Sequence, residues 1–243
     1  MFKKLCTALA LMLIAGSAFA DIPSPDQVYF AKDPTYGGSG CPYGTVFSSM
    51  SGDRQALTLL FDQFIASAGP GVPITESRKA CQIEVPLHVP TGWQFSIIGV
   101  TFRGFSAIDP GGYGVQSTLY YFQGDTRQAT AASRFPGPGT PAVGEYAVHD
   151  DVGVTSQVWS PCGATKSLWI RPSVYVRPAR NSNAMLTVDS LDATVHQIYQ
   201  IQWRRCSGGA PSTPSRNDPY NPYNPYNPYN PYGNSYNSHS VGI

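Results

Sequence analysis

Apolar and polar residues alternate along much of this chain, so that apolar side chains recur at every second position. In residues 82–89, Ile, Val, Leu and Val alternate with polar neighbours, and Trp93, Phe95 and Ile97 form the next such row. Successive side chains of a strand point to opposite faces, so this period indicates half-buried β-strands, and the helical period of 3.6 is weak throughout. Pro86 restricts its segment to a sheet edge or a bulge because proline has no N–H to donate.

Further segments rich in β-branched and aromatic residues are also predicted to be strands. They are residues 57–64, 115–122, 152–159, 168–176, 184–191 and 195–203. Turn-forming sequences separate many of them, among them Pro-Gly at 70–71, Asp-Pro-Gly-Gly at 109–112 and Pro-Gly-Pro-Gly at 136–139. Short strands with this punctuation predict an all-β fold, a β-sandwich or jelly-roll-like single domain spanning residues 21–207.

The first 20 residues have the three parts of a secretory signal peptide. Lys3 and Lys4 precede an apolar run from Leu5 to Ile14, and the segment ends in Ala18-Phe19-Ala20. The apolar run is shorter than the ~20 residues of a spanning helix. We therefore expect cleavage before Asp21, no transmembrane segment in the mature chain, and a secreted, periplasmic or cell-surface location.

Charge excludes one class of partner. Without Lys3 and Lys4 the 16 basic residues of the chain become 14, against 15 acidic residues, so the mature chain has a formal net charge of −1. Binding to nucleic acid requires a basic excess or stripe that neutralises phosphates, and the sequence has neither. We expect no nucleic-acid partner.

Four cysteines remain after the signal peptide, namely Cys41, Cys81, Cys162 and Cys206. An even number in an exported chain predicts two disulfides, for which three pairings are open. Pairing Cys41 with Cys81 and Cys162 with Cys206 is preferred, because the other pairings join the two halves of the domain through longer loops. No cysteine has the spacing of a zinc site, and we expect no metal and no cofactor.

Beyond Cys206 the sequence becomes repetitive, with five triplets of Asp or Asn, Pro and Tyr over residues 218–232. A proline at every third position favours polyproline II, which places one ring per turn along one face. We expect residues 208–243 to be a disordered low-complexity tail, and the alternative is a contact strip for envelope material. The tyrosines of that strip are Tyr220, Tyr223, Tyr226, Tyr229 and Tyr232.

Short motifs rich in glycine, aromatic residues and cysteine are distributed over residues 38–206. They are GSGCPYG at 38–44, FDQF at 61–64, SRKAC at 77–81, PTGWQF at 90–95, RGF at 103–105, WSPCG at 159–163 and WRRC at 203–206. Together they resemble a secreted family known as domain of unknown function 4360 (DUF4360). Every mature cysteine lies inside a motif, which supports a structural role for both bridges. The family has no assigned activity, and the resemblance implies none.

Aromatic residues give the better indication of function. Tyr113, Tyr120, Tyr121 and Phe122 belong to one predicted strand, and Tyr120 and Phe122 cannot share a face with Tyr121. One face therefore exposes rings, which suit stacking on sugars or contact with a protein. We predict that Tyr113, Tyr120 and Phe122 contact a ligand. The alternative is that a loop or second layer covers these rings.

Catalytic groups are sparse. No Gly-x-Ser-x-Gly elbow occurs, and the only compact titratable cluster is His149-Asp150-Asp151, interpreted as a solvated turn with a general base or cation site as the alternative. Asp62, between Phe61 and Phe64, is a carboxylate expected to bond an arginine, with a raised pKa as the alternative. Loop carboxylates at Asp109 and in residues 189–192 lack EF-hand spacing for calcium.

Two functions therefore remain open. The first is an exported non-enzymatic binding or structural module that contacts polysaccharide or an envelope or extracellular protein. The second is a secreted hydrolase, directed at glycans or proteins, or an inhibitor, with a site assembled from distant loops. A cleft with two carboxylates within ~10 Å would favour a glycosidase, and a flat aromatic face without such a cleft would favour binding.

Overall fold

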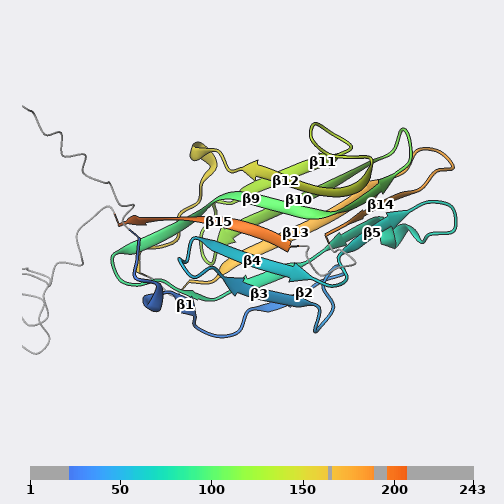
Figure 1. The fold of residues 1–243 in the computed structure, drawn as a ribbon. Helices are drawn as coiled ribbons and strands as arrows, with labels where there is room; N and C mark the ends of the chain where they lie inside the picture. Colours follow the sequence, from blue (N-terminus) through green and yellow to red (C-terminus); the bar gives the residue numbers. More distant parts are fainter. Residues whose placement is uncertain (1–21, 164–165, 189–195, 207–243) are drawn as a thin grey trace, which may run out of the picture.

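Two antiparallel sheets form the body of the molecule, in a computed structural model that describes residues 22–163, 166–188 and 196–206. Figure 1 shows them as two stacked layers, one containing β3, β4, β15 and β9 and the other β10, β11 and β13. The all-β sandwich predicted from the alternation of apolar residues is confirmed. The signal peptide and the repetitive tail lie outside the described residues.

The first sheet, here called the β10 sheet, has the order β11-β10-β13-β7-β2, and β6 also pairs with β13. Its strands are β2 (Thr35–Gly37), β6 (Arg78–Ala80), β7 (Gln82–Val85), β10 (Tyr113–Phe122), β11 (Ala129–Phe135) and β13 (Leu168–Arg177). β6 and β7 lie one after the other along the same side of β13. The two long strands β10 and β13 therefore form the centre of this sheet.

The second sheet, here called the β9 sheet, has the order β3-β4-β15-β9-β14-β5, and β12 also pairs with β9. Its strands are β3 (Val46–Met50), β4 (Ala56–Phe61), β5 (Ile65–Ala68), β9 (Trp93–Ile108), β12 (Val143–Asp151), β14 (Ala184–Thr187) and β15 (His196–Arg205). β1 (Tyr29–Phe30) and β8 (Leu87–His88) form a separate pair. Three 3₁₀ turns complete the described elements: η1 (Pro25–Gln27), η2 (Ile74–Ser77) and η3 (Val154–Ser156).

The 16-residue strand β9 contains a bulge that changes which side chains face the core. Gln200 pairs with Gly99 and Ile201 with Ile97, so Ile98 is an extra residue on β9. An extra residue shifts a period of two by one position. The buried large apolar residues accordingly fall at odd numbers in the first part of the strand, at 93, 95 and 97, and at even numbers from Val100 onward.

One predicted strand is wrong. Residues 152–159 form a loop with η3, and the strand lies earlier, as β12. Val152 and Val158 are buried, but Val154 is 83% exposed, so the valines anchor a loop and do not line one strand face. The sequence of β12 gave a weak signal because its exposed positions include the apolar residues Val143 and Ala147, whereas its less exposed positions include Gly144 and Asp150.

Hydroxyl groups connect the two sheets inside the core. The Tyr120 hydroxyl donates to the Ile97 carbonyl at 2.7 Å, and Thr118 Oγ1 lies 3.1 Å from the Tyr199 hydroxyl. Burial raises the pKa of Tyr120 to about 12. Because an unpaired buried polar group is costly, these bonds permit polar residues such as Thr118 at inward positions of β10.

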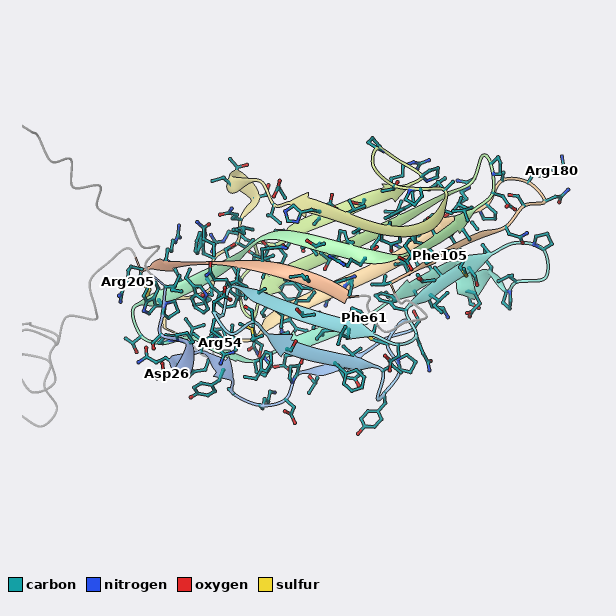
Figure 2. The ribbon with its side chains drawn as sticks, in the orientation of Figure 1. Asp26, Arg54, Phe61, Phe105, Arg180 and Arg205 are labelled. Carbon is teal, nitrogen blue, oxygen red and sulfur yellow. A yellow bond between two sulfur atoms is a disulfide. The ribbon has the colours of Figure 1, made fainter. Side chains whose placement is uncertain are left out.

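Two disulfides fix the ends of loops. Cys41 is bonded to Cys81, between β6 and β7, and Cys162 is bonded to Cys206, at the end of β15. This pairing is the one preferred from the sequence. Asp26 and Arg205 lie toward one end of the sandwich, and Arg180 lies at the opposite end (Figure 2).

Candidate functional site

The rings of β10 are divided between the core and the outer face of the β10 sheet. Tyr120 and Phe122 have no exposed surface, whereas Tyr113 and Tyr121 are half-buried on the outer side. The prediction that Tyr120 and Phe122 contact a ligand is therefore corrected: both rings pack between the sheets. Tyr113 lies on the open outer face together with Tyr121, and further rings of that face come from β13.

Strand pairing builds a row of side chains across this outer face. Arg134 of β11 lies opposite Val115 of β10, Val115 lies opposite Tyr175 of β13, and Tyr175 lies opposite Arg78 of β6. All four point away from the core, because their chain neighbours are the buried residues of each strand, apart from partly exposed Lys79 beside Arg78. An arginine therefore ends the row on each side.

The next row across the same strands consists of small side chains. It runs through Ala132, Ser117, Ser173 and Ala80. The hydroxyl oxygens of Ser117 and Ser173 are 2.9 Å apart. A row of small residues beside a row of large ones leaves a depression in the sheet surface.

That depression, here called the tyrosine hollow, has a volume of about 410 Å³. Its lining comprises Arg78, Tyr113, Val115, Ser117, Arg134, Ser173 and Tyr175. The rings of Tyr113 and Tyr175 meet edge to face with centroids 6.2 Å apart, and the guanidinium of Arg134 lies 3.9 Å from the centroid of Tyr113. The hollow thus combines aromatic walls, a hydroxyl floor and two cationic ends.

The charged residues that line the tyrosine hollow are all positive. No carboxylate belongs to its lining. Within the described ranges, Arg78 and Arg134 have no acidic partner at ion-pair distance. Glu84, on β7, is engaged by the Ser167 hydroxyl at 2.6 Å and by Lys32 at 3.5 Å, and the Ser167 bond holds its pKa below the ordinary value.

A second group of rings lies farther along the same face. Tyr121 and Trp169 are cross-strand partners with nearly parallel rings, 6.4 Å apart between centroids. The guanidinium of Arg171 lies 5.2 Å from the ring of Tyr121. The face therefore repeats the combination of ring pair and arginine, with ~27 Å between Tyr113 and Tyr121 at ~3.4 Å per residue.

A further hollow of about 480 Å³ adjoins the first and shares Tyr175 with it. It lies beside η2 and the loop that follows β13. Its lining comprises Ala68, Gly69, Pro70, Val72, Ile74, Ser77, Tyr175, Val176, Arg177, Pro178, Ala179, Asn181 and Ser182. This lining also contains no carboxylate, so Tyr175 stands between two hollows that offer no acid or base pair for hydrolysis.

The cluster at residues 149–151 belongs to the β9 sheet. It lies in edge strand β12, so its interpretation as a turn is wrong. His149 Nδ1 lies 3.0 Å from Thr101 Oγ1, and His149 Nε2 lies 3.0 Å from Asp151 Oδ1. The chain of groups resembles a hydrolytic triad, but the Asp151 side chain is 86% exposed, whereas a triad carboxylate is buried. These residues line neither hollow.

The remaining candidate carboxylates do not form a site. Asp62 is exposed on the surface after β4, which excludes a carboxyl buried between Phe61 and Phe64. Asp109 accepts a hydrogen bond from the Asn183 N–H at 2.7 Å, and residues 189–192 lie outside the described part. In residues 22–163, 166–188 and 196–206, no three His, Cys, Asp or Glu side chains are grouped as metal ligands. None of the helices described there has the length and apolarity to span a membrane.

Sequence reasoning missed Tyr175, Trp169 and the arginines of this face. The alternation in β13 does place Trp169 and Tyr175 in the phase opposite the buried residues, which was a usable signal. Arg78 and Arg134 come from strands far apart in the sequence, and only the pairing through β10 and β13 brings them to one row.

Fold and surface together define an all-β sandwich with an open aromatic and basic face. The chain belongs to the family described as domain of unknown function (DUF4360), whose model matches residues 30–206. A relative from Arthroderma benhamiae, described as an uncharacterized secreted protein, is 42% identical over 186 residues, which cover 76% of this chain and 74% of the relative. The resemblance found in the sequence and the predicted export are both confirmed.

Solved structures add little. One is titled as TmCBM61 in complex with β-1,4-galactotriose; it is 10% identical, with a TM-score of 0.27 over 73% of this chain and 90% of its own. Another, titled as a study of promiscuous carbohydrate-binding modules of the β-sandwich superfamily, is 11% identical, with a TM-score of 0.27 over 71% of this chain and 57% of its own. Scores this low carry no argument about site or ligand.

Proposed function

We propose that this protein is a secreted, non-enzymatic binding module that holds an extracellular polysaccharide on the outer face of the β10 sheet. The observation that carries the proposal is the tyrosine hollow, in which the rings of Tyr113 and Tyr175 meet over a floor of serines and no carboxylate takes part. Small-molecule and sugar sites combine apolar walls with a few placed polar groups, and this lining has both.

The shape of the surface favours an extended ligand. The ring pairs Tyr113–Tyr175 and Tyr121–Trp169 lie on the same two strands, so their separation is set by a rigid sheet. A binding surface fixed in this way needs little ordering when the ligand arrives, which lowers the entropic cost of binding. A polymer that spans both pairs would gain from two contacts in one chain.

The alternative of a glycan-directed hydrolase requires two carboxylates across a cleft. Neither of the two hollows is lined by a carboxylate. The Thr101–His149–Asp151 chain lies on the other sheet with an exposed carboxylate, where water weakens its hold on the imidazole. Binding without turnover is therefore the function that the geometry supports best.

The test is retention on a panel of immobilised polysaccharides, with the wild-type protein compared to a Tyr113→Ala, Tyr175→Ala double variant. Tyr43→Ala is the matched control, because Tyr43 is fully exposed and lies in a loop outside the hollow. We expect wild type and control to be retained alike and the double variant to lose at least about tenfold in affinity. Retention of the double variant equal to wild type would exclude this face, and release of soluble sugars by the wild type would favour the hydrolase.

A further inference from the structure

We propose that the polymer is an acidic polysaccharide, whose carboxylate or sulfate groups contact Arg78 and Arg134 at the two ends of the tyrosine hollow. This inference rests on the proposed function and adds the chemical class of the ligand. It is carried by the charge on the face and by the position of the arginines relative to the rings.

The outer face of the β10 sheet is basic although the mature chain is not. Four arginines are exposed on its strands, namely Arg78, Arg134, Arg171 and Arg177. Glu84 is the one outward-facing carboxylate on the described strands of this sheet, and Lys32 pairs with it at 3.5 Å. Since the mature chain has 14 basic and 15 acidic residues, this surplus is local to the face. A local positive potential on a near-neutral protein indicates a complementary anionic ligand.

The spacing of the arginines suits repeated anionic groups. Arg134 and Arg78 are separated by three strand-to-strand steps, from β11 to β10 to β13 to β6. At ~4.8 Å a step their backbones lie ~14 Å apart, with Val115 and the ring of Tyr175 between them in the row and Tyr113 in the adjacent row. A ligand that contacts both arginines therefore carries separated negative groups and passes over the ring of Tyr175.

The contact of Arg134 with Tyr113 holds its guanidinium in place while leaving it able to bind an anionic group. The guanidinium of Arg134 lies over the ring of Tyr113, 3.9 Å from its centroid. A contact of this kind uses the charge and not the N–H groups of the guanidinium, which can still bind a carboxylate or sulfate through two parallel bonds. Stacking also limits the rotamers of Arg134, so less entropy is lost on binding than for a freely moving side chain.

The floor of the hollow favours a sugar over other anionic polymers. Ser117 and Ser173 hydroxyls share one hydrogen bond at 2.9 Å, and each retains capacity for another partner. Sugar hydroxyls match this capacity, and the tyrosine rings match the apolar faces of sugar rings. Aromatic and basic surfaces also bind single-stranded nucleic acid, through stacked bases and a positively charged groove along the backbone, so an oligonucleotide is one arm of the experiment.

The experiment measures affinity of the purified secreted protein for polygalacturonate, dextran sulfate, neutral dextran, polyglutamate and a single-stranded oligonucleotide. An Arg78→Ala, Arg134→Ala double variant is compared with Arg103→Ala, in which an exposed arginine is removed from the outer face of the β9 sheet. We expect the wild type and Arg103→Ala to bind one acidic polysaccharide, and the double variant to bind it at least about tenfold more weakly. Binding to polygalacturonate alone would assign carboxylates, and binding to dextran sulfate alone would assign sulfates.

The outcomes separate this inference from the proposed function. Equal affinity for neutral dextran would overturn the acidic ligand and leave a polysaccharide-binding module. Tighter binding of polyglutamate or the oligonucleotide would overturn the polysaccharide. Unchanged affinity of the arginine double variant would overturn the assigned contacts, and failure to bind any polysaccharide, acidic or neutral, would overturn both proposals.

Discussion

Arg134 of β11 and Arg78 of β6 stand at opposite ends of one row of side chains on the outer face of the β10 sheet, with Val115 and Tyr175 between them. The two arginines are 56 positions apart in the numbering, and neither strand pairs with the other. Their relationship exists only because β10 and β13 lie side by side. The surface on which our account of function rests is therefore a product of topology.

A Tyr120→Phe variant tests whether the ring of Tyr120 is buried between the two sheets rather than exposed to a ligand. Changing Tyr120 to Phe removes a buried hydroxyl that donates to the Ile97 carbonyl at 2.7 Å, and we expect the free energy of unfolding to fall by about 1 kcal/mol. Polysaccharide affinity should not change, because the ring lies between the sheets. Denaturant unfolding and affinity measurements check both parts. Tyr121→Phe is the matched control and should leave stability unchanged; a loss of affinity in Tyr120→Phe would contradict the placement.

The two disulfides are expected to stabilise the fold by constraining the unfolded chain. Replacing Cys162 and Cys206 by Ala opens a loop with a sequence separation of 44, and the chain-entropy model gives a loss of about 4 kcal/mol. Replacing Cys41 and Cys81 opens one of 40, so a similar loss is expected. Urea unfolding of the two double variants measures these values. Midpoints equal to that of the wild type would show that the bridges do not constrain the unfolded chain.

The lowered pKa of Glu84 leads us to predict that the free energy of unfolding depends on pH in the acid range. Its bond from Ser167, with support from Thr35 and Lys32, lowers its pKa in the folded state below the ordinary 4.5. A lowered folded pKa means that the ionised form contributes stability above pH 4.5, and this contribution is lost as the pH falls through the folded value. Glu84→Gln should therefore be less stable by about 1–2 kcal/mol at neutral pH.

The difference between wild type and Glu84→Gln should narrow as the pH falls below 4.5. Thermal unfolding of both proteins across acid and neutral pH checks the direction. A difference that stays constant over this range would show that the charge of Glu84 contributes nothing.

The tail remains a prediction from the sequence, since residues 207–243 lie outside the described part. If the repeated tyrosines at 220, 223, 226, 229 and 232 form a contact strip, removing residues 208–243 should lower the fraction of protein retained with the cell envelope. Fractionation of cells that express the full and shortened chains measures this. Equal retention of the two chains would remove an anchoring role for the tail.

The sequence predicted the β-sandwich well because alternation is regular over β13 and over the parts of β9 on either side of its bulge, and it follows from burial on one side. It could not decide which face of β10 is buried. The inward phase includes Gln116 and Thr118, whereas the outward phase includes Val115 and Leu119, so hydrophobicity pointed in the wrong direction. Hydrogen bonds across the core, such as that between Thr118 and Tyr199, make the polar phase suitable for burial.

The arginines of the site were beyond sequence reasoning for a different reason. Each is an ordinary exposed residue of its own strand, and no local pattern marks Arg78, Arg134 or Arg171 as partners of a ring. Cross-strand neighbours depend on sheet order and register, which short strands of similar composition do not specify. Residue-by-residue patterns therefore identified Tyr113 but not the hollow around it.

The central claim is that the outer face of the β10 sheet holds the polymer, and hydroxyl-radical footprinting of the secreted protein with and without bound polysaccharide tests it most directly. We predict that bound polysaccharide protects four rings from oxidation, namely Tyr113, Tyr121, Trp169 and Tyr175. Oxidation of Tyr43, which is fully exposed in a loop outside this face, should not change. Protection confined to His149 and Phe105, on the outer face of the β9 sheet, with the four rings unchanged, would contradict the claim.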